Sequence, residues 1–300
     1  ITLTSIIPGQ LIRIPVGQFA TITISDVSVI LLIILFFIYA LAIGKKLNIP
    51  WGIFTLLLVF SLIALASTIL SAAKFTPNQI ISALLFQLRF IAYFLISIVV
   101  LNLIDKRQLF RWLNLLIPIG IIFTTAGIAQ FILVPDLSFL VSQGWDPHQK
   151  RLVSTLLDPN FTGGVLIILL SITTSLFLFQ KKNFYLVLTL FYFIGIILTF
   201  SRSSYLALLV SLATIGILKS PKFSFSFLAL FIFVIITNNQ ARLRIMDAFT
   251  IDQTVQARLE SYTKAISIFR QNPVFGVGFN TYRFAQCQYG FFSPDEPLGG

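Results

Sequence analysis

The chain has 300 residues, of which 57% are hydrophobic and only 10% are charged. Soluble domains devote about a quarter of their residues to charge, so this composition excludes a soluble protein and indicates a polytopic membrane protein. The formal net charge is +11, but the Lys and Arg residues stand in short clusters between apolar runs. Such clusters are typical of topology signals and not of nucleic-acid binding. The single cysteine, Cys287, excludes an internal disulfide, and the single histidine, His148, leaves little for a metal site, so neither a metal nor a cofactor is expected.

Apolar runs follow one another after residues 1–25, which predict a loop with weak strand character. The first four runs are each close to the roughly 20 residues that a helix needs to cross the hydrocarbon core. The sequence therefore predicts an all-α membrane fold, with a transmembrane domain at 1–237 and a long external loop at 238–300. About eight transmembrane helices are expected, at residues 26–44, 51–72, 79–104, 113–134, 161–179, 184–200, 204–218 and 223–237.

The basic clusters in the short loops predict the orientation of these helices, because cytoplasmic loops carry an excess of Lys and Arg. Alternation collects nine basic residues on one side: Lys45, Lys46, Lys106, Arg107, Arg111, Lys181, Lys182, Lys219 and Lys222. This assignment puts the loops at 1–25 and 135–158, the turn around Arg202 and the segment 238–300 on the periplasmic or extracellular side.

Within the long loop, the sequence predicts an amphipathic helix that begins near a capping box formed by Thr250 and Gln253. Pro273 ends this helix before a turn at residues 276–278. Its apolar stripe recurs at steps of three and four, which suits a membrane surface or a protein groove: Val255, Leu259, Tyr262, Ile266 and Phe269.

Arg89 stands inside an apolar run, in the segment FQLRFIAYF. Ten residues at about 1.5 Å each would put it roughly 15 Å deep in the bilayer. A charge there costs at least about 2.5 to 3.5 kcal/mol, so an intramembrane arginine is by default a functional residue. The alternative is a structural arginine bonded to carbonyls or to a carboxylate such as Asp26 or Asp158.

Arg202 lies in a tight turn, TFSRSS, between two apolar runs. Hydroxyl groups and a guanidinium at a helix N-terminus form a natural anion site, and the planar fork of an arginine suits a phosphate. The alternative is an interfacial arginine that reaches toward lipid headgroups. Arg151 adds positive electrostatic potential at the same outer surface. Arg258, like Arg242 and Arg244, lies in a segment whose charges nearly cancel, and these three are interpreted from charge alone as a solvated face.

Residues 157–164 predict a helix start, in which Asp158 or Asn160 caps the helix and two glycines permit close helix packing. His148 is interpreted as a surface-loop histidine, because no partner for it as a catalytic base is visible. The sequence has no Walker A, HExxH or GxSxG motif. Carboxylates are nearly absent from the apolar runs, which disfavours an ion-coupled transporter and points to an anionic substrate approached from the membrane.

Three segments together resemble the O-antigen ligase and O-antigen polymerase family of bacterial membrane glycosyltransferases. They are DPNFTGG, LTFSRSSYLALLVS and ARLESYTKAISIFRQNPVFGVGFNTY, and the resemblance covers about residues 150–285. It implies a GT-C type enzyme of polysaccharide biosynthesis in the cell envelope, in the inner membrane. Such enzymes transfer a glycan from undecaprenyl pyrophosphate to a lipid, glycan or protein acceptor on the outer face, without a metal or a nucleotide sugar.

The family's two arginines correspond to Arg202 and Arg258, and their implied role is to bind the pyrophosphate and stabilise it as it leaves. Arg89 and Arg151 are additional candidates for the same anion. The family's long loop normally carries a histidine after the glycine-rich turn, proposed as the base, and none follows Gly278 here. We therefore expect a truncated chain, which begins with Ile1 in place of Met and whose catalytic base lies beyond Gly300.

Two other functions stay open. A peptidoglycan polymerase of the shape, elongation and division type would need an external carboxylate as base, for which Asp247 and Asp252 are the candidates. A transporter of polysaccharide or lipid-linked glycan is the alternative from a different class, although no internal repeat supports it. The sequence leaves the glycan, the acceptor and the oligomeric state undetermined.

Overall fold

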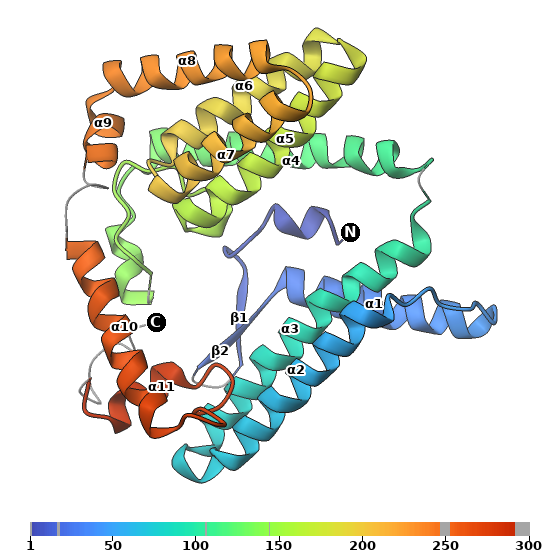
Figure 1. The fold of residues 1–300 in the computed structure, drawn as a ribbon, viewed down its shortest axis with the longest axis vertical. Helices are drawn as coiled ribbons and strands as arrows, with labels where there is room; N and C mark the ends of the chain where they lie inside the picture. Colours follow the sequence, from blue (N-terminus) through green and yellow to red (C-terminus); the bar gives the residue numbers. More distant parts are fainter. Residues whose placement is uncertain (1, 17–18, 106, 144, 247–252, 292–300) are drawn as a thin grey trace. The chain divides into compact units, whose positions relative to one another are not determined.

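The computed structural model describes residues 2–16, 19–105, 107–143, 145–246 and 253–291. Thr250, Asp247, Asp252, Lys106 and the C-terminal residues 292–300 lie outside this part of the chain. The described residues form helices and one small antiparallel sheet, as expected for an all-α membrane protein (Figure 1). They divide into two compact units: unit 1 comprises Ile1–Ser5, Ile12–Leu109 and Gln253–Gly300, and unit 2 comprises Ile6–Leu11 and Phe110–Asp252.

Unit 1 begins with a β-hairpin in which β1 (Arg13–Val16) pairs with β2 (Ala20–Thr23). The chain continues directly into α1 (Ile24–Ala42), because the Thr23 side chain accepts a hydrogen bond from the Asp26 N–H and completes a capping box with that residue. Two further apolar helices follow, α2 (Trp51–Leu70) and α3 (Pro77–Leu103). Of the three, α3 packs against both α1 and α2. The hairpin thus confirms the weak strand character of residues 1–25.

The end of the chain also belongs to unit 1. The predicted amphipathic helix is α10 (Gln253–Gln271), and a short helix, α11 (Tyr282–Gln288), follows the glycine turn. This segment is bonded to the end of α2: the Ser67 hydroxyl donates to the Phe275 carbonyl, and the Phe279 N–H donates to Thr68 Oγ1 at 3.0 Å. Segments that lie about 200 residues apart in the sequence are therefore bonded to each other within one unit.

Unit 2 has a hydrophobic core whose side chains are almost completely buried. Its helices are α4 (Leu109–Leu133), α5 (Pro159–Gln180), α6 (Asn183–Leu198), α7 (Arg202–Leu218), α8 (Pro221–Thr237) and α9 (Asn239–Met246). The largest side chains of this core include Phe123, Leu166, Leu170, Tyr192, Phe193 and Leu208. Short 3-10 turns elsewhere in the chain cover Thr4–Ile6, Ala72–Lys74, Ser138–Gln143 and Ser154–Leu156.

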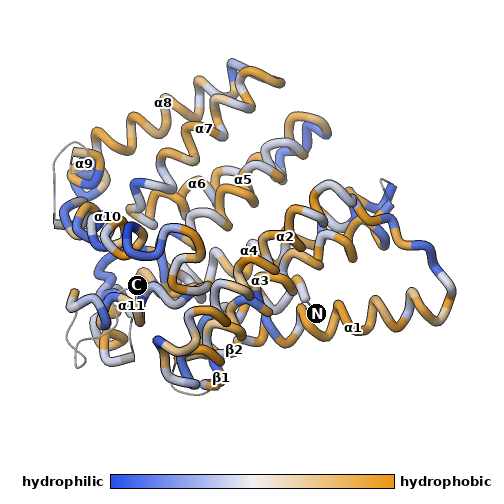
Figure 2. Tube along the Cα trace, turned by 60° about the horizontal axis from the view of Figure 1, so that its bottom comes forward, coloured by the Kyte–Doolittle hydropathy of each residue, from blue (hydrophilic) through white to orange (hydrophobic). Residues whose placement is uncertain are grey.

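Apolar helices form at all eight predicted positions, but they are not equally long. Five of them, α1 to α5, have the length and composition to cross a membrane. A sixth span is possible if α8 and α9, which meet at a bend of 97°, count as one. The helices α6 and α7 have 16 and 17 residues, short of the roughly 20 that a bilayer requires. The chain is thus a multi-pass membrane protein with five or six candidate spans among its described residues, and a total of eight stays a prediction. Figure 2 shows the hydrophobic residues running along these helices.

Candidate functional site

The turn around Arg202 joins α6 to α7 in three residues. Phe200 adopts a left-handed conformation with φ of 46°, which reverses the chain after Leu198. Ser201 then caps α7, because its hydroxyl oxygen accepts a hydrogen bond from the Ser204 N–H at 3.2 Å. Arg202 is therefore the first residue of α7 and lies, half-buried, at the positive end of the helix dipole. The predicted turn and its helix N-terminus are confirmed.

The start of α5 is bonded to this turn. Asp158 caps α5 as predicted and accepts from the N–H groups of Asn160 and Phe161 at 2.7 and 2.8 Å. Asn160 Oδ1 in turn accepts from the hydroxyls of Ser201 and Ser203, at 2.6 and 3.0 Å. The two helix starts, 41 residues apart in sequence, therefore form one hydrogen-bonded layer.

Gly163 allows this close approach of α5 to α7. A Cβ atom at Gly163 would lie 1.8 Å from Ser204 Oγ, whereas one at Gly164 would meet nothing within 4 Å. The predicted role of the glycines in helix packing is thus confirmed for Gly163. The buried Ser204 hydroxyl itself has no hydrogen-bond partner.

Arg151 is hydrogen-bonded to the backbone of the turn between α6 and α7. Its Nε donates to the Thr199 carbonyl at 3.0 Å and its Nη2 donates to the Phe200 carbonyl at 3.2 Å. Burial of the guanidinium, followed by the positive charge of Arg244, lowers the pKa of Arg151 to about 10. Arg151 therefore stays protonated at neutral pH, and two of its five N–H donors bind backbone oxygens.

Arg244 is the residue of this region that the sequence analysis interpreted wrongly, as part of a solvated face. It lies in α9, whose sharp bend away from α8 directs the chain back toward the loop before α5. The Gln240 side chain fixes this position by donating to the Lys150 carbonyl at 3.0 Å. Arg244 is half-buried, and its charge acts on Arg151. No sequence signal indicates this bend, because short polar helices lack an apolar period.

His148 lies half-buried in the same environment, not on the open surface that was predicted. Burial first, and then the charge of Arg151, lower the pKa of His148 below its ordinary value of 6.5. The imidazole is therefore neutral at pH 7.

Unit 2 thus contains what we call the arginine cluster: Arg151, Arg202 and Arg244. The charges of Arg202, Arg244 and the single carboxylate Asp158 all act on Arg151. Positive charge is in excess there, which suits an anion with several negative charges. Among the residues that the structure describes, no group of three His, Cys, Asp or Glu side chains is arranged to hold a metal ion.

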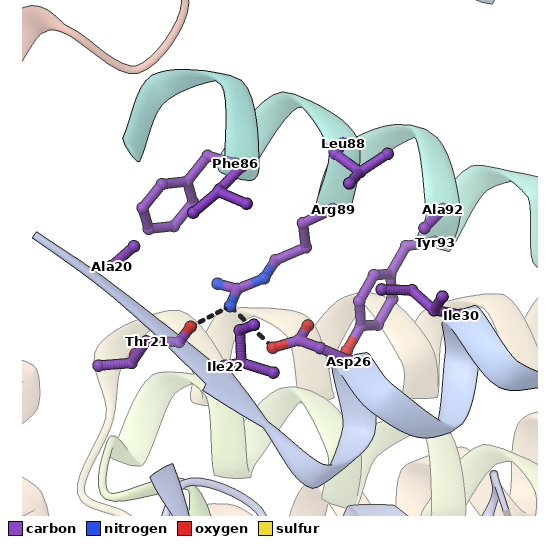
Figure 3. A pocket seen from close by; sticks show the side chains of 11 residues that line it. Ala20, Thr21, Ile22, Asp26, Ile30, Phe86, Leu88, Arg89, Ala92 and Tyr93 are labelled. Carbon is purple, nitrogen blue, oxygen red and sulfur yellow. Dashed lines mark hydrogen bonds and ion pairs between the residues drawn. The ribbon is translucent and has the colours of Figure 1, made fainter. Parts of the chain in front are cut away.

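Arg89 belongs to unit 1 and is paired. Its Nη2 donates to the Thr21 carbonyl at 2.5 Å and to Asp26 Oδ2 at 2.7 Å (Figure 3). Asp26 is thus the carboxylate partner, one of the two that the sequence analysis named. Asp26 lies in the first turn of α1, so Arg89, near the middle of α3, is bonded to the start of a neighbouring helix. The depth of Arg89 in the bilayer stays a prediction.

Arg258 also belongs to unit 1, on α10, and its side chain is exposed. The predicted stripe of this helix is exposed too where its side chains are described: Leu259, Tyr262, Ile266 and Phe269. Of the four predicted arginines, Arg151 and Arg202 therefore lie together in unit 2. Arg89 and Arg258 belong to unit 1.

The model of a family described as O-antigen ligase matches residues 184–299, a region that runs from α6 through the end of the chain. It contains Arg202, Arg244 and Arg258, whereas Arg89, Arg151 and the DPNFTGG segment precede it. No curated protein and no solved structure matches the chain.

Proposed function

We propose that the protein is a membrane glycosyltransferase of the GT-C type, a proposal supported by the match of residues 184–299 to the O-antigen ligase family. Its donor is a glycan carried on undecaprenyl pyrophosphate, and its acceptor is a lipid, a glycan or a protein hydroxyl. Transfer takes place without a metal, on the outer face of the bacterial inner membrane, where the segment 238–300 also lies.

The arginine cluster is the observation that carries this proposal. Pyrophosphate bears several negative charges and many acceptor oxygens, and guanidinium groups bind such oxygens in a fixed, planar geometry. Arg202 is positioned by the capped N-terminus of α7, and Arg151 by two backbone carbonyls. Both are thereby held before a ligand arrives, which is the arrangement that favours stabilisation of developing charge.

The proposed reaction is a displacement at the anomeric carbon of the donor sugar. The acceptor hydroxyl oxygen forms a bond to this carbon, and the bond from the carbon to the pyrophosphate oxygen breaks. The leaving pyrophosphate takes the electron pair, and the arginine cluster stabilises the negative charge that develops on it. The hydroxyl proton passes to a base, which is not an arginine because guanidinium groups remain protonated.

Arg258 is proposed as a further pyrophosphate ligand, on its correspondence to the family's second arginine and on its exposed position in α10. Arg89 is less suited to that role, because its ion pair with Asp26 already balances its charge.

The test is glycan transfer by the complete protein in liposomes that contain the lipid-linked donor. Arg202→Ala should lower the turnover number roughly 100-fold or more, as the loss of a charge-stabilising donor does in other transferases and hydrolases. Arg242→Ala is the control, because this arginine is exposed and donates to Asn239 of its own helix, at 2.8 Å. Unchanged turnover in the Arg202 variant would remove the cluster from the mechanism.

The same liposomes separate the transporter from the enzyme. A transporter would move the lipid-linked glycan across the bilayer and leave its covalent structure intact, whereas a transferase yields free undecaprenyl pyrophosphate and a longer product. Movement without a new glycosidic bond would contradict the proposal.

A further inference from the structure

A second group of arginines, distinct from the arginine cluster, meets at an aromatic ring in unit 1. The guanidinium carbons of Arg89 and Arg283 lie 5.0 and 5.5 Å from the centroid of the Phe86 ring. Arg283 comes from α11, and it also stacks on Phe284 at 4.6 Å. The ring therefore holds two cations that are separated by almost 200 residues in the sequence.

Positive charge is in excess at this ring. Asp26 balances Arg89, at 2.7 Å. Arg283, in contrast, donates to neutral groups, the Phe19 carbonyl at 2.9 Å and the Ser82 hydroxyl at 3.0 Å. Its Nε is buried and has no hydrogen-bond partner. A buried donor without an acceptor is costly, so the position favours an additional acceptor from a ligand.

Two apolar hollows are lined by Arg89 and by Phe86, the ring that Arg283 also contacts. On one side is a cavity of about 110 Å³ between the hairpin, α1 and α3, which Figure 3 shows beside Arg89. On the other side is a hollow of about 500 Å³ lined by Phe86, Phe90, Phe94 and Phe279. The three α3 residues recur at every fourth position, so they form one aromatic stripe that starts at the cations.

A ligand that fits both features has a negative head and a hydrocarbon chain. We propose that unit 1 binds an anionic phospholipid of the surrounding bilayer, with its phosphate at Arg283 and its chain along Phe86, Phe90 and Phe94 opposite Phe279. Arg89 and Arg283 outnumber Asp26, and Arg13 of the hairpin adds a further positive charge near Arg89, so the site suits the negative charge of a phosphodiester. The site does not depend on glycosyl transfer, and its ligand stays bound as a structural lipid.

The experiment is native mass spectrometry of the complete protein, released from detergent that contains equal amounts of phosphatidylglycerol and phosphatidylcholine. We expect the wild-type protein to retain phosphatidylglycerol preferentially. Arg283→Gln should weaken this preference about tenfold, since it removes a charge-assisted hydrogen bond. Arg270→Gln is the matched control on an exposed arginine of the same unit, and it should retain the wild-type preference.

Further arms identify the ligand. Phe279→Ala should reduce retention of both lipids alike, because it shortens the hydrophobic contact without changing charge. Equal loss in the Arg270 and Arg283 variants would overturn the site in favour of general surface attraction. Displacement of phosphatidylglycerol by inorganic phosphate would overturn the lipid, and displacement by equimolar polyprenyl phosphate would overturn the assignment to a bilayer phospholipid. Thermal unfolding in phosphatidylcholine distinguishes these results from misfolding of a variant.

Discussion

Two arginines of the short helix α9 are expected to differ in function although they are two positions apart. Arg244 acts on Arg151 within the arginine cluster, whereas Arg242 is exposed and donates to its neighbour Asn239. If the cluster binds pyrophosphate, Arg244→Gln should raise the KM for the lipid-linked donor about tenfold, as expected for one charge-assisted hydrogen bond. Arg242→Gln should leave KM unchanged.

Initial rates measured over a range of donor concentrations give this comparison. A fall in kcat with unchanged KM would mean that Arg244 acts on the transition state alone. Equal KM values for both variants and the wild type would exclude Arg244 from donor binding.

Single residues also show where sequence reasoning succeeds and where it fails. Arg202 was identified correctly as the start of a helix, because a capping serine and an apolar run mark that start locally. For Arg89 the sequence named two carboxylates as its structural partner, Asp26 and Asp158, and only the packing of α3 against α1 shows that Asp26 is the one bonded to it. Arg244 was missed because its importance arises from a bend that no local pattern encodes.

At the scale of elements, the contact between α5 and α7 gives a sharp prediction. Gly163→Ala should destabilise the protein by about 1 to 3 kcal/mol, because the new Cβ collides with Ser204 Oγ in a tightly packed layer. Gly164→Ala should be neutral or slightly stabilising, since its Cβ meets open space and alanine favours the helix.

Thermal unfolding of both variants in the same detergent tests this contrast. The double variant Gly163→Ala with Ser204→Gly removes the colliding hydroxyl and should recover part of the loss. Equal midpoints for the two alanine variants would mean that α5 and α7 do not approach as closely as described.

The helices themselves were largely predictable, because apolar composition alone determines where a membrane helix forms. All eight predicted runs became helices, with ends shifted by a few residues where capping decided them, as at Asp158 and Thr23. Apolar composition alone did not separate spans from shorter helices, since α6 and α7 are apolar but have only 16 and 17 residues. The bonds between distant segments, such as Ser67 with Phe275, leave no trace in local patterns.

For the whole molecule, the proposed orientation is open to a direct test, because the chain has one cysteine. Cys287 lies in α11 and is partly exposed. If the segment 238–300 is external, a membrane-impermeant maleimide should label Cys287 in intact spheroplasts. Lys46→Cys in a Cys287→Ala background should be labelled only after the membrane is permeabilised. The reversed pattern would invert the topology and separate the arginine cluster from an external acceptor.

Unit 1 is assembled from both ends of the chain, and this has a consequence for its biosynthesis. The helices α1 to α3 leave the ribosome first, but Phe279 and Arg283, which complete the site at Phe86, are translated about 190 residues later. Translation proceeds at roughly 5 to 20 residues per second, so that aromatic surface of the first helices stays uncovered for on the order of ten seconds or more. During this interval the newly inserted helices depend on lipid, or on the insertion machinery, to shield the surface that the end of the chain later covers.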